Sequence, residues 1–380
     1  MKKSTLSFVF FLTYFLCFTQ TNVSGVISSD TTWGLSESPF LLTGSVLVVD
    51  GVNLTIEAGV VIKFNSGLYI KNEGTITAVG TSSEKITFKS NASSPQKSDW
   101  VGIKIRPTGG STIGSNQDYS SGSQFKYVVI MHADTGLYIY DTGLHISNSE
   151  FENNNRAVEI RATEGVVIDN SIFTNNNVGI WSEYEDYESG DGVSAISNTH
   201  IKNSIFSSNF YGIDLIMNQR DFINLNITTN IFTENNYGID FGGGGYGPRV
   251  HSVLISENIV YNSTNYGVNL NRVYGQGTGT SLDYPLEFTK NIIVNNAGGS
   301  LMFEYSPSVK FKVHNNILVS NTAGVNNIAS IGSPSTSGHL FNNNTIISKG
   351  KNVYFGGSSS YHANNITFTN NLFGNSSNND

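Results

Sequence analysis

Apolar and polar residues alternate along most of this chain, and turns rich in asparagine interrupt the alternation again and again. Residues 166–181 show the pattern clearly and read VVIDNSIFTNNNVGIW. A period of two residues is typical of β-strands, whereas an amphipathic helix shows a period near 3.6. Asn and Gly tolerate the positive φ angles that tight turns require. The pattern therefore predicts short strands separated by tight turns.

Related copies of this stretch follow one another through more than half of the sequence. Each copy has Asn or Ser, one further residue, and then a large apolar residue that serves as its marker. Successive markers are 22 to 33 residues apart, a period typical of repeat architectures. A leucine-rich-repeat solenoid has a similar period, but its L-x-x-L-x-L frame is not found here. The chain is therefore expected to form stacked β-coils, with these markers: Phe151, Phe173, Phe206, Phe232, Val260, Ile293, Leu318, Ile346 and Phe373.

Stacked coils assign a role to two sets of positions. Inward residues such as Ile168, Phe173 and Ile180 would stack about 4.8 Å from their equivalents in the next coil and form the core. The Asn or Ser before each marker would form a second ladder, in which side-chain amides bond one another and the backbone. We interpret this ladder as structural; its members are Ser149, Ser171, Ser204, Asn230, Asn258, Asn291, Asn316, Asn344 and Asn371.

The region before these repeats carries motifs of its own. It contains LTIEAGVVIKF from Leu54, GTITAVG, KITF at 85–88 and WVGIKI at 100–105. Over about eighty residues these motifs closely resemble the opening of secreted proteins of the pectin-lyase-like superfamily, and the later copies resemble the repeat of that superfamily. The resemblance implies an all-β, single-stranded right-handed parallel β-helix, a β-solenoid of roughly eleven to twelve coils. It implies no single activity, because unrelated activities share the fold.

The ends of the chain suggest its organisation. Lys2 and Lys3 precede an apolar run over 8–18, as in a secretory signal peptide, and the run is too short to span a bilayer. We expect a signal peptide at 1–25, an entry or cap segment at 26–53, the β-helix at 54–373 and a polar tail at 374–380. A secreted or cell-surface location follows. The only cysteine, Cys17, lies in the signal peptide, so stacking rather than disulfides would stabilise the mature protein.

Composition excludes some partners. Only 13% of residues are charged, the formal net charge is −8, and no basic stripe is present, so electrostatics do not favour nucleic acid or an anionic membrane. Asn-x-Ser/Thr sequons are frequent, although Asn, Ser and Thr are so common that roughly this number arises by chance. One sequon, at Asn22, lies in the predicted signal peptide. The others would carry glycans in a eukaryotic host: Asn53, Asn91, Asn226, Asn262, Asn343, Asn365 and Asn375.

One strand in each coil carries Gly, an aliphatic residue, a variable residue and an apolar residue. The variable residue faces outward, and we call the resulting column the outward ladder: Tyr138, Glu159, Trp181, Asp214, Asp240 and Asn269, continued less regularly by Asn326 and Tyr354. The longest loops follow these strands, at 182–198, 216–225, 242–252 and 271–285. They contribute further polar and aromatic side chains: Tyr184, Arg220, Tyr246, Arg249, His251, Arg272 and Tyr274.

Long loops on a rigid scaffold are where binding residues concentrate, and aromatic rings stack on sugar rings. We therefore hypothesise a groove for an extracellular polysaccharide, centred on Trp181, Asp214 and Asp240 and including Glu159 and Asn269. Two alternatives stay open. The loops are tolerated insertions on a structural or adhesive rod, or the protein is a polysaccharide lyase or glycoside hydrolase.

The evidence for catalysis in the sequence is mixed. The Asn-Thr-Asp, Asp-Asp and Gly-His-Gly motifs of the polygalacturonases that share the fold are missing. Asp214 and Asp240 occupy equivalent positions in adjacent coils and would be able to share a Ca²⁺ ion, as the resemblance to pectate lyases implies. Binding alone requires no cofactor. Whether the protein is an enzyme is left open.

The last coil is followed by only seven polar residues, 374–380. A solenoid needs a cap, because its final coil otherwise presents an open strand edge. Three explanations remain: the sequence is a fragment, charge and glycans shield the end, or a partner chain covers it.

Overall fold

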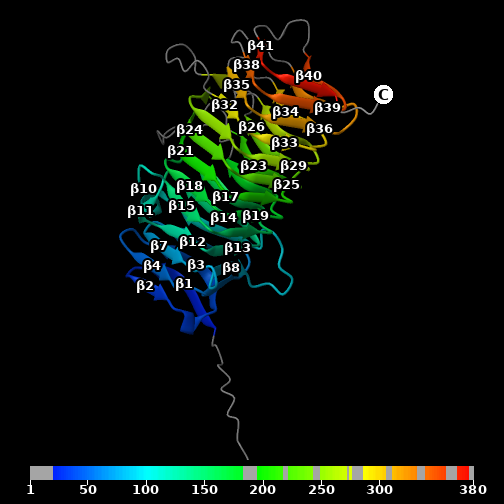
Figure 1. Cartoon of the computed structure of the whole chain (residues 1–380). Coiled ribbons are helices and arrows are strands. Elements are labelled where there is room, and N and C mark those ends of the chain that lie inside the picture. Colours follow the sequence, from blue (N-terminus) through cyan, green and yellow to red (C-terminus); the bar gives the residue numbers. More distant parts are fainter. Residues whose placement is uncertain are drawn as a thin grey trace, which may run out of the picture.

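The structure is a computed structural model, and it describes residues 20–182, 195–216, 221–242, 249–271, 274–275, 286–304, 310–331, 339–356 and 366–375. The chain winds into coils that follow one another along a single axis, so that the colours of Figure 1 run in sequence order from blue to red. Neighbouring coils pair through parallel strands throughout, for example β18 with β21 and β22 with β25. The predicted all-β right-handed parallel β-helix is confirmed.

Three stacks of parallel strands form the walls of the helix, one strand of each stack in every coil. The first stack comprises β2 (Thr31–Trp33), β4 (Asn53–Ile56), β7 (Thr75–Val79), β12 (Gln124–Lys126), β15 (Leu144–Ser147), β18 (Val166–Asp169), β21 (Ala195–Lys202), β24 (Asp221–Thr228), β28 (Val253–Ser256), β32 (Leu286–Thr289), β35 (Phe311–His314), β38 (His339–Asn342) and β41 (Ile366–Thr369).

The second stack comprises β1 (Thr21–Ile27), the start of β3 (Phe40–Val48), β5 (Val61–Phe64), β8 (Ile86–Ser90), β13 (Val128–Met131), β16 (Glu150–Glu152), β19 (Ile172–Thr174), β22 (Ile205–Ser207), β25 (Ile231–Thr233), β29 (Ile259–Tyr261), β33 (Ile292–Val294), β36 (Ile317–Ser320), β39 (Thr345–Ser348) and β42 (Leu372–Asn375).

The third stack begins with the end of β3 and continues through β6 (Tyr69–Asn72), β9 (Trp100–Ile105), β14 (Ala133–Tyr140), β17 (Arg156–Arg161), β20 (Val178–Ser182), β23 (Tyr211–Ile216), β26 (Tyr237–Gly242), β30 (Tyr266–Asn271), β34 (Gly299–Glu304), β37 (Asn326–Ile331) and β40 (Lys351–Gly356). Outside the stacks lie an antiparallel hairpin, β10 (Ser111–Ile113) with β11 (Tyr119–Gly122), the short strands β27 (Arg249–Val250) and β31 (Tyr274–Gly275), and two 3-10 turns, η1 (Leu35–Glu37) and η2 (Pro107–Gly109).

The core is a set of inward columns, as the alternation predicts. Phe151, Phe173, Phe206 and Phe232 are fully buried and stack face to face, with ring centroids 4.6–4.9 Å apart. This separation matches the spacing of neighbouring strands, so each coil places its ring directly on the ring below. Each buried large side chain contributes roughly 1.5–3 kcal/mol, and repetition of such columns along the axis stabilises the rod.

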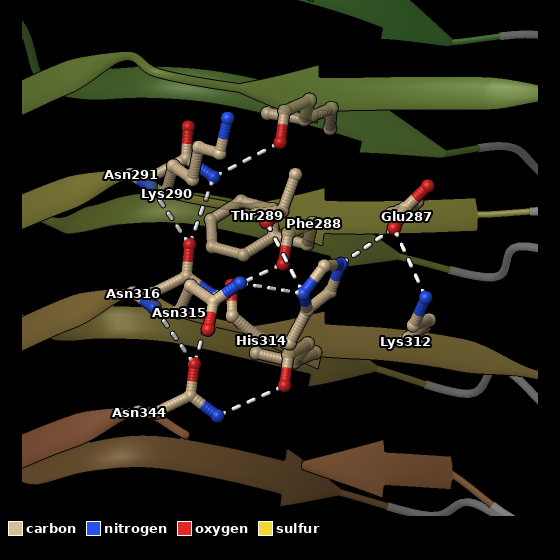
Figure 2. Close-up of polar contacts among 12 residues, drawn as sticks. Glu287, Phe288, Thr289, Lys290, Asn291, Lys312, His314, Asn315, Asn316 and Asn344 are labelled. Carbon is tan, nitrogen blue, oxygen red and sulfur yellow. Dashed lines mark hydrogen bonds and ion pairs between the residues drawn. The ribbon is translucent and has the colours of Figure 1, made fainter. Parts of the chain in front are cut away.

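The predicted Asn and Ser ladder is present and buried. Figure 2 shows three of its members, in which the side-chain oxygen of Asn316 accepts the backbone N–H of Asn291 at 2.8 Å and that of Asn344 accepts the N–H of Asn316 at 3.0 Å. The residue just before each ladder position has a positive φ, such as +58° at Asn315. This conformation explains why Asn precedes so many ladder residues.

A second buried ladder was not anticipated from the sequence. It lies at the next corner of the coil and contains Asn154, Asn176, Asn209 and Asn235. The side-chain oxygen of each of the last three accepts hydrogen bonds from the backbone N–H and the side-chain amide of the member before it, at 2.9–3.1 Å. Their amide groups donate to backbone carbonyls such as that of Phe173. The two corners on either side of the second stack are therefore held by ladders of hydrogen-bonded side chains.

The two ends of the helix differ. At the N-terminal end Trp33 stacks on Phe40 at 5.1 Å and is 3% exposed. Strand β1 spans the predicted signal-peptide cleavage point and pairs on both sides of it with β3. In the last described coil Leu372 and Phe373 are 61% and 45% exposed; a partner chain at this end stays a prediction.

None of the described helical segments has the length and apolarity needed to cross a membrane.

Candidate functional site

The outward ladder runs along the third stack in the expected register. The pairings place Tyr138 beside Glu159, Glu159 beside Trp181, Trp181 beside Asp214, Asp214 beside Asp240 and Asp240 beside Asn269. The column then continues through Met302, Ala329 and Tyr354. Asn326, which was expected in this column, instead pairs with Lys351, because it lies at the start of β37, three residues before Ala329. Five consecutive coils therefore place Glu159, Trp181, Asp214, Asp240 and Asn269 side by side.

A glycine stands two residues before four of these five ladder positions, as Gly179, Gly212, Gly238 and Gly267, and Ala157 stands before Glu159. A Cβ atom built on Gly212 would lie 2.5 Å from the carbonyl oxygen of Gly238 and 2.8 Å from the ring of Phe232. A Cβ on Gly238 would lie 2.6 Å from the carbonyl oxygen of Gly267. The backbones of successive coils approach too closely here for any side chain. The recurrent Gly-aliphatic-x motif is thus a packing requirement that fixes the ladder.

An ion pair and a cation–π contact occupy the N-terminal end of the ladder. Glu159 is 2% exposed, and its carboxylate lies 2.6 Å from Nε of Arg161 and 3.5 Å from a guanidinium nitrogen of Arg156. Burial raises the pKa of Glu159, and the two guanidinium groups oppose that rise. Arg156 also lies over the ring of Trp181, 3.6 Å from its centroid. One face of Trp181 is therefore already covered by a cation.

Two carboxyl groups lie in the centre of the ladder. Asp214 is 5% exposed, and one of its oxygens, Oδ1, is buried without a hydrogen-bond partner among the described residues. Burial raises the pKa of Asp214 to about 8, and the neighbouring Asp240 carboxylate adds to the rise. Asp240 accepts a hydrogen bond from Asn269 Nδ2 at 3.1 Å. Burial and the neighbouring carboxyl group thus favour the protonated form of Asp214.

Tyrosines flank these carboxyl groups. Tyr211 and Tyr237 precede Gly212 and Gly238, and their rings stack at 5.1 Å with an angle of 14° between the planes. Burial raises the pKa of Tyr211 to about 12, and Asp240 and Asp214 add to the rise. Burial also raises the pKa of Tyr266 in the next coil. The sequence analysis did not select these tyrosines, although a Tyr-Gly-aliphatic motif in three successive coils was a visible signal.

The remaining predicted site residues are placed as follows. Four of them, Tyr184, Arg220, Tyr246 and Arg272, lie outside the described residues. The backbones of Arg249 and Tyr274 pair with each other through β27 and β31, and Arg249 also pairs with Asp221 in β24. Nε2 of His251 lies 2.9 Å from a carboxylate oxygen of Asp221. Arg249 and Tyr274 thus lie in an extension of the first stack, with His251 next to it, and that they share one site with the outward ladder stays a prediction.

Calcium was proposed for Asp214 and Asp240. Among the described residues, no group of three or more His, Cys, Asp or Glu side chains is placed to hold a metal ion. The available oxygen donors in the ladder are the two carboxyl groups and the Asn269 amide, whose Oδ1 is likewise buried without a partner among the described residues. These are the donor types that Ca²⁺ takes, so a Ca²⁺ site here remains a proposal.

The predicted glycosylation sites occupy different surroundings. Asn91, Asn262 and Asn343 are exposed, Asn262 and Asn343 at turns with positive φ. Asn53 and Asn226 lie within strands β4 and β24 and are partly buried. Asn375 is exposed at the end of β42, whereas Asn365 lies outside the described residues. Glycosylation at any of them stays a prediction.

Comparison with known proteins supports the fold. Residues 25–136 match the family model of the pectate-lyase-like beta helix domain. A curated relative, Protein bark beetle of Drosophila melanogaster, is 41% identical over 68 residues, which are 18% of this chain and 2% of the relative. The chain thus spans a very small part of the curated relative that it matches. The expected resemblance to pectate-lyase-like, right-handed parallel β-helix proteins is confirmed.

Two solved structures extend this similarity to most of the chain. The A-module of mannuronan C-5 epimerase AlgE6 from Azotobacter vinelandii has a TM-score of 0.56 and 12% identity, covering 90% of this chain and 91% of that one. The catalytic unit of a GH87 alpha-1,3-glucanase from Streptomyces thermodiastaticus has a TM-score of 0.50 and 14% identity, covering 89% of this chain and 61% of that one. At these identities the similarity concerns the fold.

Proposed function

We propose that this protein acts outside the cell and binds a polysaccharide along the outward ladder from Glu159 to Asn269. The observation that carries the proposal is the buried, unpartnered Oδ1 of Asp214 on an otherwise outward-facing column. Buried polar atoms are nearly always hydrogen-bonded in proteins, so an unpartnered one favours a site that a ligand or an ion completes.

Aromatic rings beside the carboxyl groups support a carbohydrate as the ligand. Trp181, Tyr211 and Tyr237 are partly exposed and lie next to Asp214 and Asp240 in the same three coils. Sugar rings pack on aromatic rings while their hydroxyl groups bond to carboxylates and amides. The structural relatives named above are a mannuronan epimerase and a glucanase, whose names both denote activity on polysaccharides.

The test is affinity electrophoresis through gels that contain alginate, pectate, xylan, chitosan or β-glucan. The variant with Trp181→Ala, Asp214→Asn and Asp240→Asn should lose at least tenfold in affinity for the polymer that retards the wild type. Tyr354→Ala is the matched control, since Tyr354 belongs to the same column several coils away and is 38% exposed. Equal retardation of the wild type and the triple variant in every gel would refute binding at the ladder.

A polysaccharide lyase or glycoside hydrolase is the second candidate. It is favoured by the pKa of Asp214, raised to about 8 by burial and by Asp240. A neutral acid beside an ionised carboxylate is the arrangement by which enzymes separate acid and base roles. Tyr211, in the strand of Asp214, and Tyr237, in the strand of Asp240, supply further hydroxyl groups beside this pair.

Catalysis is tested by incubating the protein with the same polymers and recording both the absorbance of unsaturated products and new reducing ends. Asp214→Asn should abolish either signal while the polymer is still retarded in gels. A parallel series with Ca²⁺ or a chelator tests the proposed ion. Binding without either product would reject the enzyme and leave the binding function.

A further inference from the structure

A groove with a volume of about 1010 Å³ lies on a different wall of the helix from the outward ladder. One side is the β10–β11 hairpin, which projects beside β15 and β18 in Figure 1. Its floor runs from the turn before β18 along the outward face of the first stack through β21 and β24 to β28, where it includes His200, Asn226 and Leu254. Every residue that lines the groove belongs to the described part of the chain.

The hairpin wall is held at its base and near its tip. At the base, the backbone N–H of Ser111 donates to the carbonyl of Gly143 at 2.8 Å, and Ser111 Oγ accepts the N–H of His145 at 3.0 Å. Near the tip, Lys202 Nζ of β21 donates to Oε1 of Gln117 at 2.9 Å. The groove is therefore built by contacts on both sides of the hairpin and is a feature of the folded chain.

Neutral hydrogen-bonding groups dominate the lining. Nδ2 of Asn224 lies 2.8 Å from Oδ1 of Asn198 in the neighbouring coil, and Nδ2 of Asn226 lies 3.0 Å from Oδ1 of Asn224 in the same strand. Hydroxyl groups come from the hairpin, at Ser111, Thr112 and Ser115, and from the coils beside it, at Thr142 and Thr228. The charged lining residues are Asp141 and Glu164, both acidic, and no Lys or Arg lines the groove. An anionic ligand would meet repulsion from these two carboxylates.

His200 lies in the middle of the floor, beside Asn226 in the register of β21 and β24. It is half-buried, and no described residue hydrogen-bonds its ring. Burial lowers the pKa of His200, and the Lys202 charge lowers it further. Both effects favour the neutral ring, which offers a ligand one donor and one acceptor.

We propose that this groove binds a neutral oligosaccharide of about three pyranose units. The floor covers four successive coils, from the turn before β18 to β28, and so spans about 14 Å at the usual strand spacing. A pyranose unit is close to one strand spacing in length. The amides, hydroxyls and imidazole match the hydroxyl groups of an uncharged sugar chain. The sugar has two conceivable sources, a free glycan or one attached to this chain, because the sequon Asn226-Ile227-Thr228 lies on the floor itself.

Unglycosylated protein produced in bacteria tests the first source. Titration with maltotriose, cellotriose and chitotriose, followed by calorimetry or by the NMR signals of the His200 ring, should reveal binding, whereas trigalacturonate should not bind. Asn226→Trp fills the groove from an outward strand position and should weaken binding at least tenfold. Leu340→Trp is the matched control, because Leu340 lies in the same outward column three coils beyond the groove. It should change affinity less than twofold.

Protein secreted from eukaryotic cells tests the second source, by mass spectrometry of the peptide that contains Asn226. A glycan there, together with its resistance to enzymatic removal until the protein is unfolded, would place the attached sugar in the groove. The proposal is overturned if no neutral trisaccharide binds and Asn226 carries no protected glycan, or if Asn226→Trp leaves trisaccharide binding unchanged. The triple variant of the outward ladder should bind trisaccharide like the wild type, so failure of one site is distinguished from failure of the other.

Discussion

Replacement of Asn258 offers a direct test of how the amide ladder stabilises the helix. The side chain is 1% exposed and makes four hydrogen bonds. Its Oδ1 accepts the backbone N–H of Asn230 at 3.0 Å and Nδ2 of Asn230 at 3.1 Å. Its Nδ2 donates to the carbonyl of Ile227 at 2.9 Å and to Oδ1 of Asn291 at 3.0 Å. One residue thereby joins three successive coils.

Asn258→Ala withdraws the acceptor from the Asn230 N–H and a donor from the Ile227 carbonyl. A buried polar group left without a partner costs about 1–3 kcal/mol, so the two together should lower the free energy of unfolding by about 2–6 kcal/mol. Asn258→Ser should cost roughly half as much, about 1–3 kcal/mol, because a serine oxygen can replace the acceptor. Ser171 already does so in this ladder, accepting the N–H of Ser149 at 3.2 Å.

Urea unfolding followed by circular dichroism measures the loss, and hydrogen exchange of the Asn230 amide reports the lost bond locally. The local measurement is needed because stacked repeats need not unfold in one step. Asn177→Ala is the matched control, since Asn177 is exposed and its two side-chain hydrogen bonds, to Asn155 of the adjacent coil and from Lys97, are exposed to solvent. If Asn258→Ala costs no more than Asn177→Ala and the Asn230 amide stays protected, the ladder does not stabilise the fold as argued.

Three further outcomes are expected. Gly212→Ala should destabilise by about 1–3 kcal/mol in thermal unfolding, because its Cβ would meet a backbone carbonyl of the next coil; Gly114→Ala, with its nearest contact at 3.5 Å, should be nearly neutral. The pKa of Asp214, raised to about 8 from 3.8, means that the folded chain holds a proton that the unfolded chain releases, so stability should fall as pH rises between these values. Asp214→Asn should remove that decline in melting temperatures recorded from pH 4 to 9, and an unchanged slope would contradict the assignment. Mass spectrometry of the secreted protein should find the mature N-terminus before Thr21 rather than after Gly25, because cleavage after Gly25 would remove five of the seven residues of β1.

Much of the fold was predictable from local pattern. Alternation with a period of two residues identifies strands, and markers such as Phe173 and Phe206 repeat once per coil, so equivalent residues must stack. The buried Asn ladder and the register of Trp181 with Asp214 and Asp240 follow from the same periodicity. In a solenoid each coil contacts its neighbours, which makes sequence equivalence a guide to spatial adjacency.

The environment of each ladder residue was decided only by the tertiary structure. The period of two places Glu159 and Asp214 outward, yet both are almost completely buried. The Arg156 guanidinium lies over the Trp181 ring of the next coil. This contact depends on how the two coils are aligned and on the direction of each side chain, neither of which a repeat pattern shows. The stacked tyrosines before Gly212 and Gly238 likewise become part of the site only when the coils are superposed.

The groove beside the β10–β11 hairpin is the feature that the sequence predicted least. The hairpin interrupts the repeat at residues 111–122, and Gln117 meets Lys202 across 85 positions of the chain. Periodicity predicts the positions that recur in every coil. The placement of an inserted hairpin depends instead on its contacts with side chains of other coils, which the repeat pattern does not show. The sequence therefore determined the rod and its columns, and the tertiary contacts alone decided where that rod forms a cavity.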